Sequence, residues 1–348
     1  MRAAIAAALV ALLLAAVSTP ASAHFNPTGP GSHSSAVDWW LWQAQESVKV
    51  REERAREASH MARDRHGRDR HSLANLAYPT LPPLPHHSQV NPLPGPSAAR
   101  LYAEMNVAQY LSLKAAAAAA AAANASAPAL DQRAVVTFAS YRVLASAFPA
   151  RQATVYDPAV RQQFKAAIAA GNFSAASFAA AQAMGYAAAD AVLTGRVTDG
   201  VAAVNYKTVP ASNATGLAPG RYRLAPATAA PTPAQKTWEG AQLGSALSFS
   251  YPSLNGHDLY HSLPAVEELV PLVVGTPEYA ADLKYVAAFG GAAGAPGGTN
   301  RTADQTDAAD FWAQGPGTST PAGQWLTAAA GRLSEEATEV ERAELYAR

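Results

Sequence analysis

The run of alanines at residues 115–123 constrains the fold more than any other feature of this sequence. Alanine has the highest helix propensity of all residues, and its small side chain lets helices pack closely. The run continues a helical pattern that begins near Ser97, and Asn124 is the expected stop. One face of this helix carries the residues that we expect in the core: Leu101, Met105, Ala108 and either Leu111 or Ser112.

Helical periodicity with clear start and stop signals recurs along the rest of the sequence. Asp131 is the expected cap of a helix that ends at Pro149. The core face of that helix would carry Val135, Phe138, Ala139, Leu144 and Phe148. The same signals predict further helices at residues 37–50, 158–170, 175–194 and 277–289. Residues 205–233 and 238–271 lack periodicity, so we predict an all-α fold of antiparallel helix bundles with long irregular connections.

The last part of the sequence predicts two helices joined by a turn. Thr302 is expected to cap a short helix, with Asp304 and Asp307 near its positive end. Its apolar face would carry Ala308, Phe311 and Trp312, and Gly315-Pro316-Gly317 would end it. A second, amphipathic helix is expected to run to the end of the sequence, with Leu326, Ala329, Leu333, Ala337, Val340 and Leu345 on its apolar face. The pair predicts an αα-hairpin.

Charge and cysteine content exclude several classes of function. Lys plus Arg and Asp plus Glu number 26 each, so no overall field would attract nucleic acid or an anionic membrane. The charged stretch at residues 51–70 interleaves acids with its arginines and therefore does not predict a nucleic-acid partner. The sequence has no cysteine, which excludes disulfides and thiolate chemistry.

The N-terminus predicts export and a three-part organisation. Residues 1–23 have the pattern of a signal peptide: Arg2, an apolar stretch too short to span a bilayer, and Ala21-Ser22-Ala23 before the cleavage point. We expect a secreted or extracytoplasmic protein with no membrane association after cleavage. Residues 24–96 would contain a leader, a helix with Trp39, Trp40 and Trp42, and a mobile insertion rich in charge, His and Pro, which trypsin should cut first. Residues 97–348 would form the helical body.

Four Asn-x-Ser/Thr sequences are candidate N-glycosylation sites in a eukaryotic secretory host. They begin at Asn124, Asn172, Asn213 and Asn300. Chance occurrence is the alternative, because the sequence is rich in Ser and Thr.

Several segments resemble vanadium-dependent haloperoxidases and the related type 2 phosphatidic acid phosphatase superfamily. DWWLWQAQESVK, from Asp38, resembles the first helix of the bacterial members, and QVNPLPGPSAARLYAEMNVAQYLSLKAA, from Gln89, resembles the helix that follows. ASYRVLASAFPARQ and TPEYAADLKYVAAFG are further matches. The most specific block is RTADQTDAADFWAQGPGTSTPAGQW, from Arg301, which these proteins carry shortly before their first anion-binding motif.

The resemblance implies an all-α fold with a pocket of basic residues and a histidine that holds vanadate or a substrate phosphate. The family's motifs for that pocket include Arg-Pro, Ser-Gly-His and Ser-Arg, and none of these occurs in the sequence. We therefore assign no catalytic or vanadate-binding residue and expect the chain to be inactive. The catalytic part would follow Arg348, so the bundle is expected to be incomplete at its C-terminus and to self-associate through unpaired helix faces at Trp312, Trp325, Leu326 and Leu333.

Several alternatives remain open at this point. A helical binding or scaffold protein derived from such an enzyme, or a fragment of an acid phosphatase, would share the same features. His257 and His261 stand four residues apart and are weak candidates for a metal site, although Asn255-Gly256 and Pro264 disfavour a helix there. His24 as a mature N-terminus is a weak candidate for copper. The histidines of the insertion are either a polar segment or metal ligands: His60, His66, His71, His86 and His87.

Overall fold

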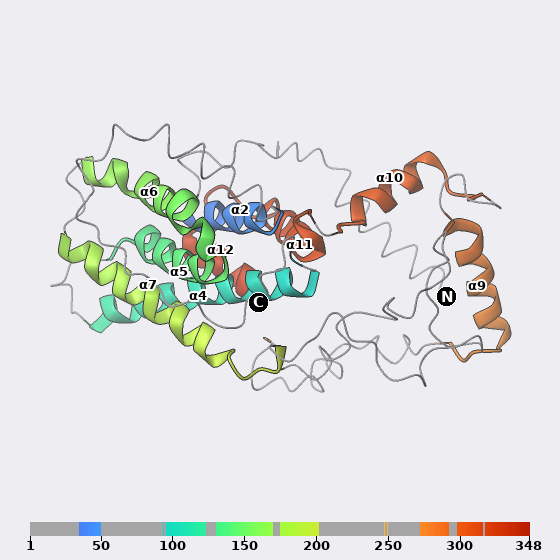
Figure 1. Cartoon of the computed structure of the whole chain (residues 1–348), viewed down its shortest axis with the longest axis horizontal. Coiled ribbons are helices and arrows are strands. Elements are labelled where there is room, and N and C mark those ends of the chain that lie inside the picture. Colours follow the sequence, from blue (N-terminus) through green and yellow to red (C-terminus); the bar gives the residue numbers. More distant parts are fainter. Residues whose placement is uncertain are drawn as a thin grey trace. The chain divides into compact units, whose positions relative to one another are not determined.

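The computed structural model describes residues 35–49, 93, 95–122, 130–169, 175–201, 247, 249, 272–291, 298–315 and 317–348. These residues form helices and contain no strand, which confirms the predicted all-α class (Figure 1). In chain order, the α-helices are α2 (Ala36–Lys49), α4 (Gly95–Ala122), α5 (Gln132–Ala147), α6 (Asp157–Ala169), α7 (Ala175–Gly195), α9 (Pro277–Phe289), α10 (Ala303–Trp312), α11 (Thr320–Ala330) and α12 (Glu339–Ala347). A 3-10 turn at Pro149–Arg151 and a π-helical turn at Gln152–Tyr156 join α5 to α6.

The chain divides into two compact units. The first unit comprises Met1–Leu193 and Gln314–Arg348, and the second comprises Thr194–Ala313. This division differs from the boundary after residue 96 that composition suggested. Helix α2, which we had grouped with the leader, packs against α4, α5 and α12 inside the first unit.

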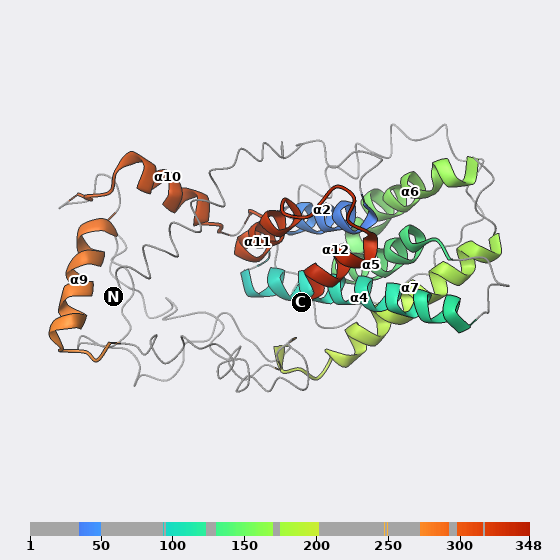
Figure 2. The same cartoon turned by 180° about the vertical axis from the view of Figure 1, so that it is seen from behind.

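Helix α5 is the centre of the first unit. It packs against α2, α4 and α6, and both views of the molecule show these helices grouped side by side (Figures 1 and 2). Asp131 caps it as predicted, accepting a hydrogen bond from the Arg133 N–H. The predicted core residues Val135, Phe138, Ala139, Leu144 and Phe148 are all buried.

The structure of α4 shows which of two neighbouring residues, Leu111 or Ser112, belongs to its core face. Ser112 is buried, whereas Leu111 is 42% exposed. The Ser112 hydroxyl donates to the Gln109 carbonyl at 2.7 Å, and the Gln109 amide donates to the Ser140 hydroxyl of α5 at 2.8 Å. The buried Ser112 hydroxyl thus has a hydrogen-bond partner in its own helix, which offsets the free-energy cost of removing it from water.

The end of the chain differs from the single amphipathic helix that we predicted. Helix α11 ends at Ala330, and residues 331–338 form a loop before α12. The loop is stabilised by Thr338, whose side chain forms a capping box with Glu341. Because the helical register restarts at Glu339, the predicted core residue Leu345 is 42% exposed, and Ala343 and Tyr346 are buried instead. Helices α10 and α11 belong to different compact units, so the predicted αα-hairpin between them stays a prediction.

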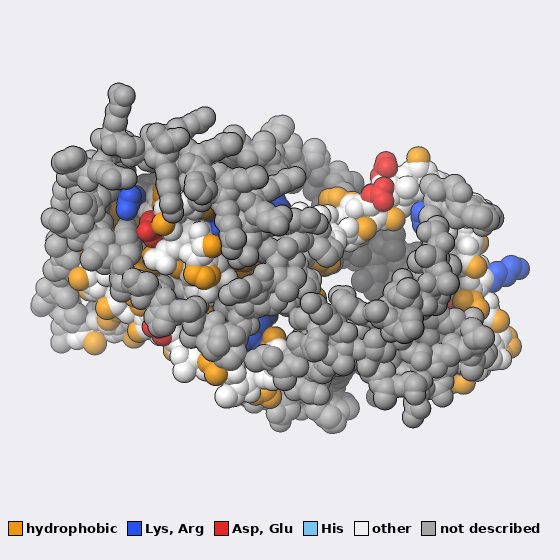
Figure 3. Space-filling view, viewed as in Figure 1, with side chains coloured by type: hydrophobic (Ala, Val, Ile, Leu, Met, Phe, Trp, Pro, Cys, Tyr) orange, Lys and Arg blue, Asp and Glu red, His pale blue; other side chains and the backbone are white. Residues whose placement is uncertain are grey.

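In the second unit, α9 and α10 have no buried residue. The predicted bounds of α9 agree with the structure, and Thr302 caps α10 through a capping box with Gln305. The space-filling view shows hydrophobic side chains at the surface over α9 (Figure 3), and Leu283, Tyr285 and Val286 are 57–62% exposed. Local capping signals therefore formed these helices without burial.

None of the described helices combines the length and apolarity needed to cross a membrane. The predicted signal peptide at 1–23 and the predicted mobile insertion after α2 lie outside the described residues.

Candidate functional site

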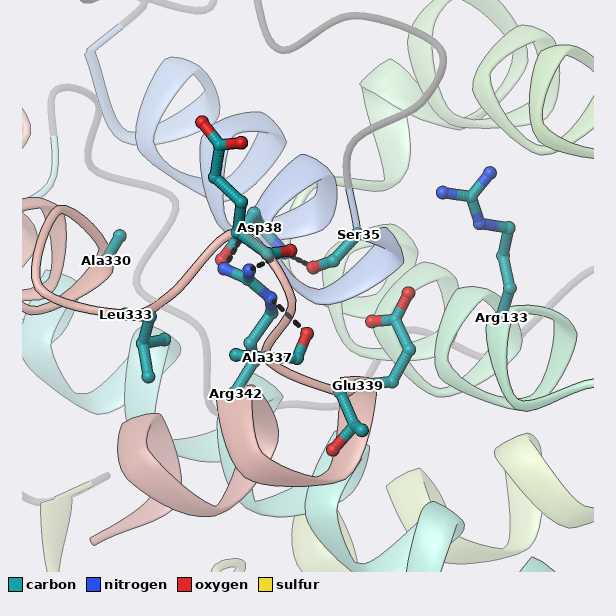
Figure 4. A pocket seen from close by; sticks show the side chains of 10 residues that line it. Ser35, Asp38, Arg133, Ala330, Leu333, Ala337, Glu339 and Arg342 are labelled. Carbon is teal, nitrogen blue, oxygen red and sulfur yellow. Dashed lines mark hydrogen bonds and ion pairs between the residues drawn. The ribbon is translucent and has the colours of Figure 1, made fainter. Parts of the chain in front are cut away.

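A pocket lies where the two ends of the described chain meet in the first unit. The first turn of α2, the start of α5, and the segment from the end of α11 into α12 form its walls (Figure 4). Its volume is about 720 Å³. The lining residues are Ser35, Asp38, Arg133, Ala330, Leu333, Glu335, Ala337, Thr338, Glu339 and Arg342.

Glu339 connects α12 to the beginning of α2. Its two carboxylate oxygens accept hydrogen bonds from the backbone N–H groups of Ala36 and Val37, at 2.7 and 3.0 Å. The first N–H groups of a helix have no partner within the helix and carry partial positive charge. Glu339 therefore caps α2 with a negative charge from a helix about 300 positions later in the sequence.

Arg342, one helical turn after Glu339, is buried and supplies hydrogen-bond donors where Glu339 supplies acceptors. Its Nη1 donates to the Asp38 carboxylate at 2.6 Å. Its Nη2 donates to the carbonyls of Ser334 and Glu335, and its Nε donates to the carbonyl of Ala337. All three guanidinium nitrogens thus bind protein acceptors, and the same side chain fixes the loop that interrupts the predicted helix.

Tyr346 completes the contact on the second oxygen of Asp38. The tyrosine hydroxyl donates to Asp38 Oδ1 at 2.7 Å. Burial first, and the nearby Asp38 carboxylate second, raise the pKa of Tyr346 well above its usual value, so the hydroxyl keeps its proton. The Asn106 amide of α4 donates to the Tyr346 carbonyl at 3.2 Å, which joins a third helix to the cluster.

The pocket does not suit vanadate, the cofactor that the family resemblance implies. A multiply charged oxyanion requires several cationic and N–H donors aimed at one point. Here three carboxylates, of Asp38, Glu335 and Glu339, face two guanidinium groups, and Arg342 donates from every nitrogen to the protein itself. The two backbone N–H groups at the start of α2 are occupied by Glu339.

Of the site residues predicted from sequence, the structure describes one. Asn300 is exposed, and Thr302 of the same Asn-x-Thr sequence caps α10. His257 and His261 lie outside the described residues, as do Asn124, Asn172, Asn213 and all the histidines considered for metal or copper binding. Within the described part of the chain, no group of three or more His, Asp or Glu residues is arranged to hold a metal ion.

Sequence reasoning missed the cluster formed by Asp38, Glu339 and Arg342. Asp38 stands out in the sequence only as the first residue of a resembling block, and Glu339 and Arg342 do not stand out at all. The Glu-x-x-Arg spacing does place both side chains on one face of α12. No local signal, however, names the N-terminus of α2 as their partner.

Comparisons of this chain with protein-family models, with curated proteins and with solved structures find no match.

Proposed function

We propose that this chain is an exported helical domain of the haloperoxidase-like kind that is not itself catalytic. The order of the resembling segments supports the relationship, and the missing Arg-Pro, Ser-Gly-His and Ser-Arg sequences support the lack of catalysis. The observation that carries the proposal is the hydrogen bonding of Arg342. Its guanidinium nitrogens donate to Asp38 and to backbone carbonyls. Four of the five N–H groups of this guanidinium are used in this way, so it lacks the pair of free donors that bidentate binding of a vanadate or phosphate group requires.

Two assays on the purified chain test this proposal. Vanadate, peroxide and bromide are added with a phenol dye, and an aryl phosphate is supplied separately, with an active vanadium haloperoxidase assayed alongside as a positive control. We expect neither bromination nor hydrolysis above the rate without protein. Vanadate-dependent turnover would contradict the proposal.

A variant at Asp38 distinguishes a latent oxyanion site from the absence of any oxyanion site. Asp38→Asn removes the charge that holds Arg342 Nη1 while it preserves the shape of the side chain. Vanadium NMR then reports binding directly, without any need for turnover. We expect no broadened signal with the wild-type protein or the variant, because three of the four Arg342 hydrogen bonds remain and Glu339 still occupies the α2 N–H groups. Binding by Asp38→Asn alone would reveal a latent oxyanion site, and binding by both proteins would overturn the assignment.

The second candidate function is that of a helical binding protein, and the size of the pocket favours it. A volume of about 720 Å³ falls within the range of small-molecule sites. Its walls combine apolar side chains of Ala330 and Leu333 with carboxylates, which suits a small amphipathic molecule. A thermal-shift screen would detect a ligand, and Leu333→Trp, which fills the pocket, should abolish the shift. A shift that survives this substitution would assign binding to another surface.

A further inference from the structure

The end of the chain, residues 331–348, folds back over the first unit and is here called the strap. It consists of the loop at 331–338 and helix α12. The loop, together with the first turn of α12, forms one wall of the pocket, and α2 with the start of α5 forms the other (Figure 4). Any movement of the strap therefore changes the pocket.

The strap is attached to α2 by two sets of charged interactions, with one carboxylate supplied by each side. The strap supplies the Glu339 carboxylate to the positive end of α2. In return, α2 supplies the Asp38 carboxylate to Arg342 and Tyr346 of the strap. Hydrogen bonds to charged groups are stronger than neutral ones, so these contacts account for much of the attachment.

The apolar part of the attachment is smaller than that of α5, although α12 packs against α4 as well as α2, and Leu333 and Val340 are partly buried against the core. Only Arg342, Ala343 and Tyr346 of α12 are buried. In α5, by contrast, residues 134–146 are buried without interruption. Since apolar burial is the main source of stability in a protein core, the strap is held less firmly than the bundle beneath it.

Helix α12 also has its own local stabilisation. The Thr338 hydroxyl accepts from the Glu341 N–H, while the Glu341 carboxylate accepts from the Thr338 N–H and hydroxyl. These hydrogen bonds lower the pKa of Glu341, and the bond from the Thr338 backbone N–H has the largest effect. The capping box depends on no other helix, so it remains available when α12 leaves the bundle.

We propose that the strap is a releasable wall of the pocket: it detaches from α2 and α4 as a unit, opening the pocket, while α2, α4 and α5 stay folded. Glu339 sets this equilibrium through its two hydrogen bonds to the start of α2. A ligand that contacts both walls would shift the equilibrium toward the closed state, because it binds that state more tightly.

Hydrogen exchange measured by mass spectrometry on the full chain tests the proposal. In the wild-type protein we expect the amides of α12 to exchange at least tenfold faster than those of α5. Glu339→Gln removes the charge and retains one acceptor, so it should accelerate exchange in α12 by about a further tenfold, which is the order expected for weakening a hydrogen bond to a charged group. Because global unfolding also breaks the Glu339 hydrogen bonds, exchange in α5 should rise by no more than the same factor, and α5 should remain at least tenfold slower to exchange than α12.

Glu336→Gln is the matched control, since Glu336 is an exposed residue of the same loop and the same substitution there should leave α12 unchanged. Tyr346→Phe, which removes one hydrogen bond to Asp38 and keeps the ring, should accelerate α12 by less than Glu339→Gln. Equal exchange of α12 and α5 would overturn the proposal, because the strap would then open only by global unfolding. Equal effects of the two Gln variants on exchange in α12 would overturn it too.

Discussion

Helices α5 and α9 are similar in their sequence signals and opposite in their environment. Each begins at a side-chain cap, Asp131 in α5 and Thr276 in α9. Residues 134–146 of α5 are buried, whereas α9 has no buried residue. The difference shows that capping and propensity decide where a helix forms, and that its neighbours decide how much of it is buried.

The burial of α5 extends to polar residues, and two of these form hydrogen bonds or ion pairs with other helices. The Trp40 indole donates to Thr137 at 3.1 Å, and Arg142 pairs with Asp190 of α7 at 2.5 Å. Such pairing offsets the cost of removing polar groups from water. No hydrogen bond of this kind is required in α9, where exposed side chains remain in contact with solvent.

The most direct test of this contrast between α5 and α9 is to remove a large side chain from each helix. The Phe138 ring contacts the rings of Phe164, Phe178 and Tyr186 at centroid distances of 4.9–5.8 Å. We expect Phe138→Ala to lower the free energy of unfolding by about 3–5 kcal/mol through the cavity that it leaves. Leu283→Ala in α9 should change it by about 0.5 kcal/mol or less. Urea unfolding measures both, and a similar cost for the two variants would contradict the contrast.

A smaller effect is expected from adding one methyl group where α7 crosses α5. A Cβ atom at Gly185 would lie 2.7 Å from the Phe138 Cβ and 2.7 Å from the Val135 carbonyl oxygen. Because a backbone atom cannot move aside cheaply, Gly185→Ala should cost about 1–3 kcal/mol. Gly195→Ala in the same helix is the matched control, since no atom lies within 4 Å of its added Cβ. Thermal unfolding that ranks the two variants equally would mean that the helices are not in close contact.

The smallest expected effect is the pH dependence that Asp157 gives to the free energy of unfolding. Burial raises the pKa of Asp157, although the Tyr141 hydroxyl donates to its carboxylate at 2.9 Å and acts in the opposite direction. The folded chain therefore binds this proton more tightly than the unfolded chain does. The contribution of Asp157 to the free energy of unfolding falls as pH rises from about 3.9, the usual unfolded pKa, through the raised folded value.

Asp157→Asn removes the titration and still offers an acceptor to Tyr141. The free energy of unfolding of the wild-type protein minus that of the variant should decrease with rising pH across this window. Urea unfolding at several pH values measures the difference. An increase with pH would mean that hydrogen bonding, and not burial, dominates at Asp157.

The sequence by itself determined the class of fold and the positions of most helices. Side-chain caps at Asp131 and Thr302 and the proline at the start of α9 are read correctly because they act within a few residues of the helix that they start. Apolar spacing identified the core face of α5 for the same reason: the positions that share a face are fixed by the helix itself.

Only the tertiary structure decided which helices meet and where the last helix breaks. The loop after α11 depends on Arg342, whose hydrogen bonds to three loop carbonyls form as it pairs with Asp38. The pocket depends equally on Glu339, which reaches the N–H groups that begin α2. These partners stand about 300 residues apart, and sequence spacing carries no information about a contact that exists only once the chain has folded back on itself.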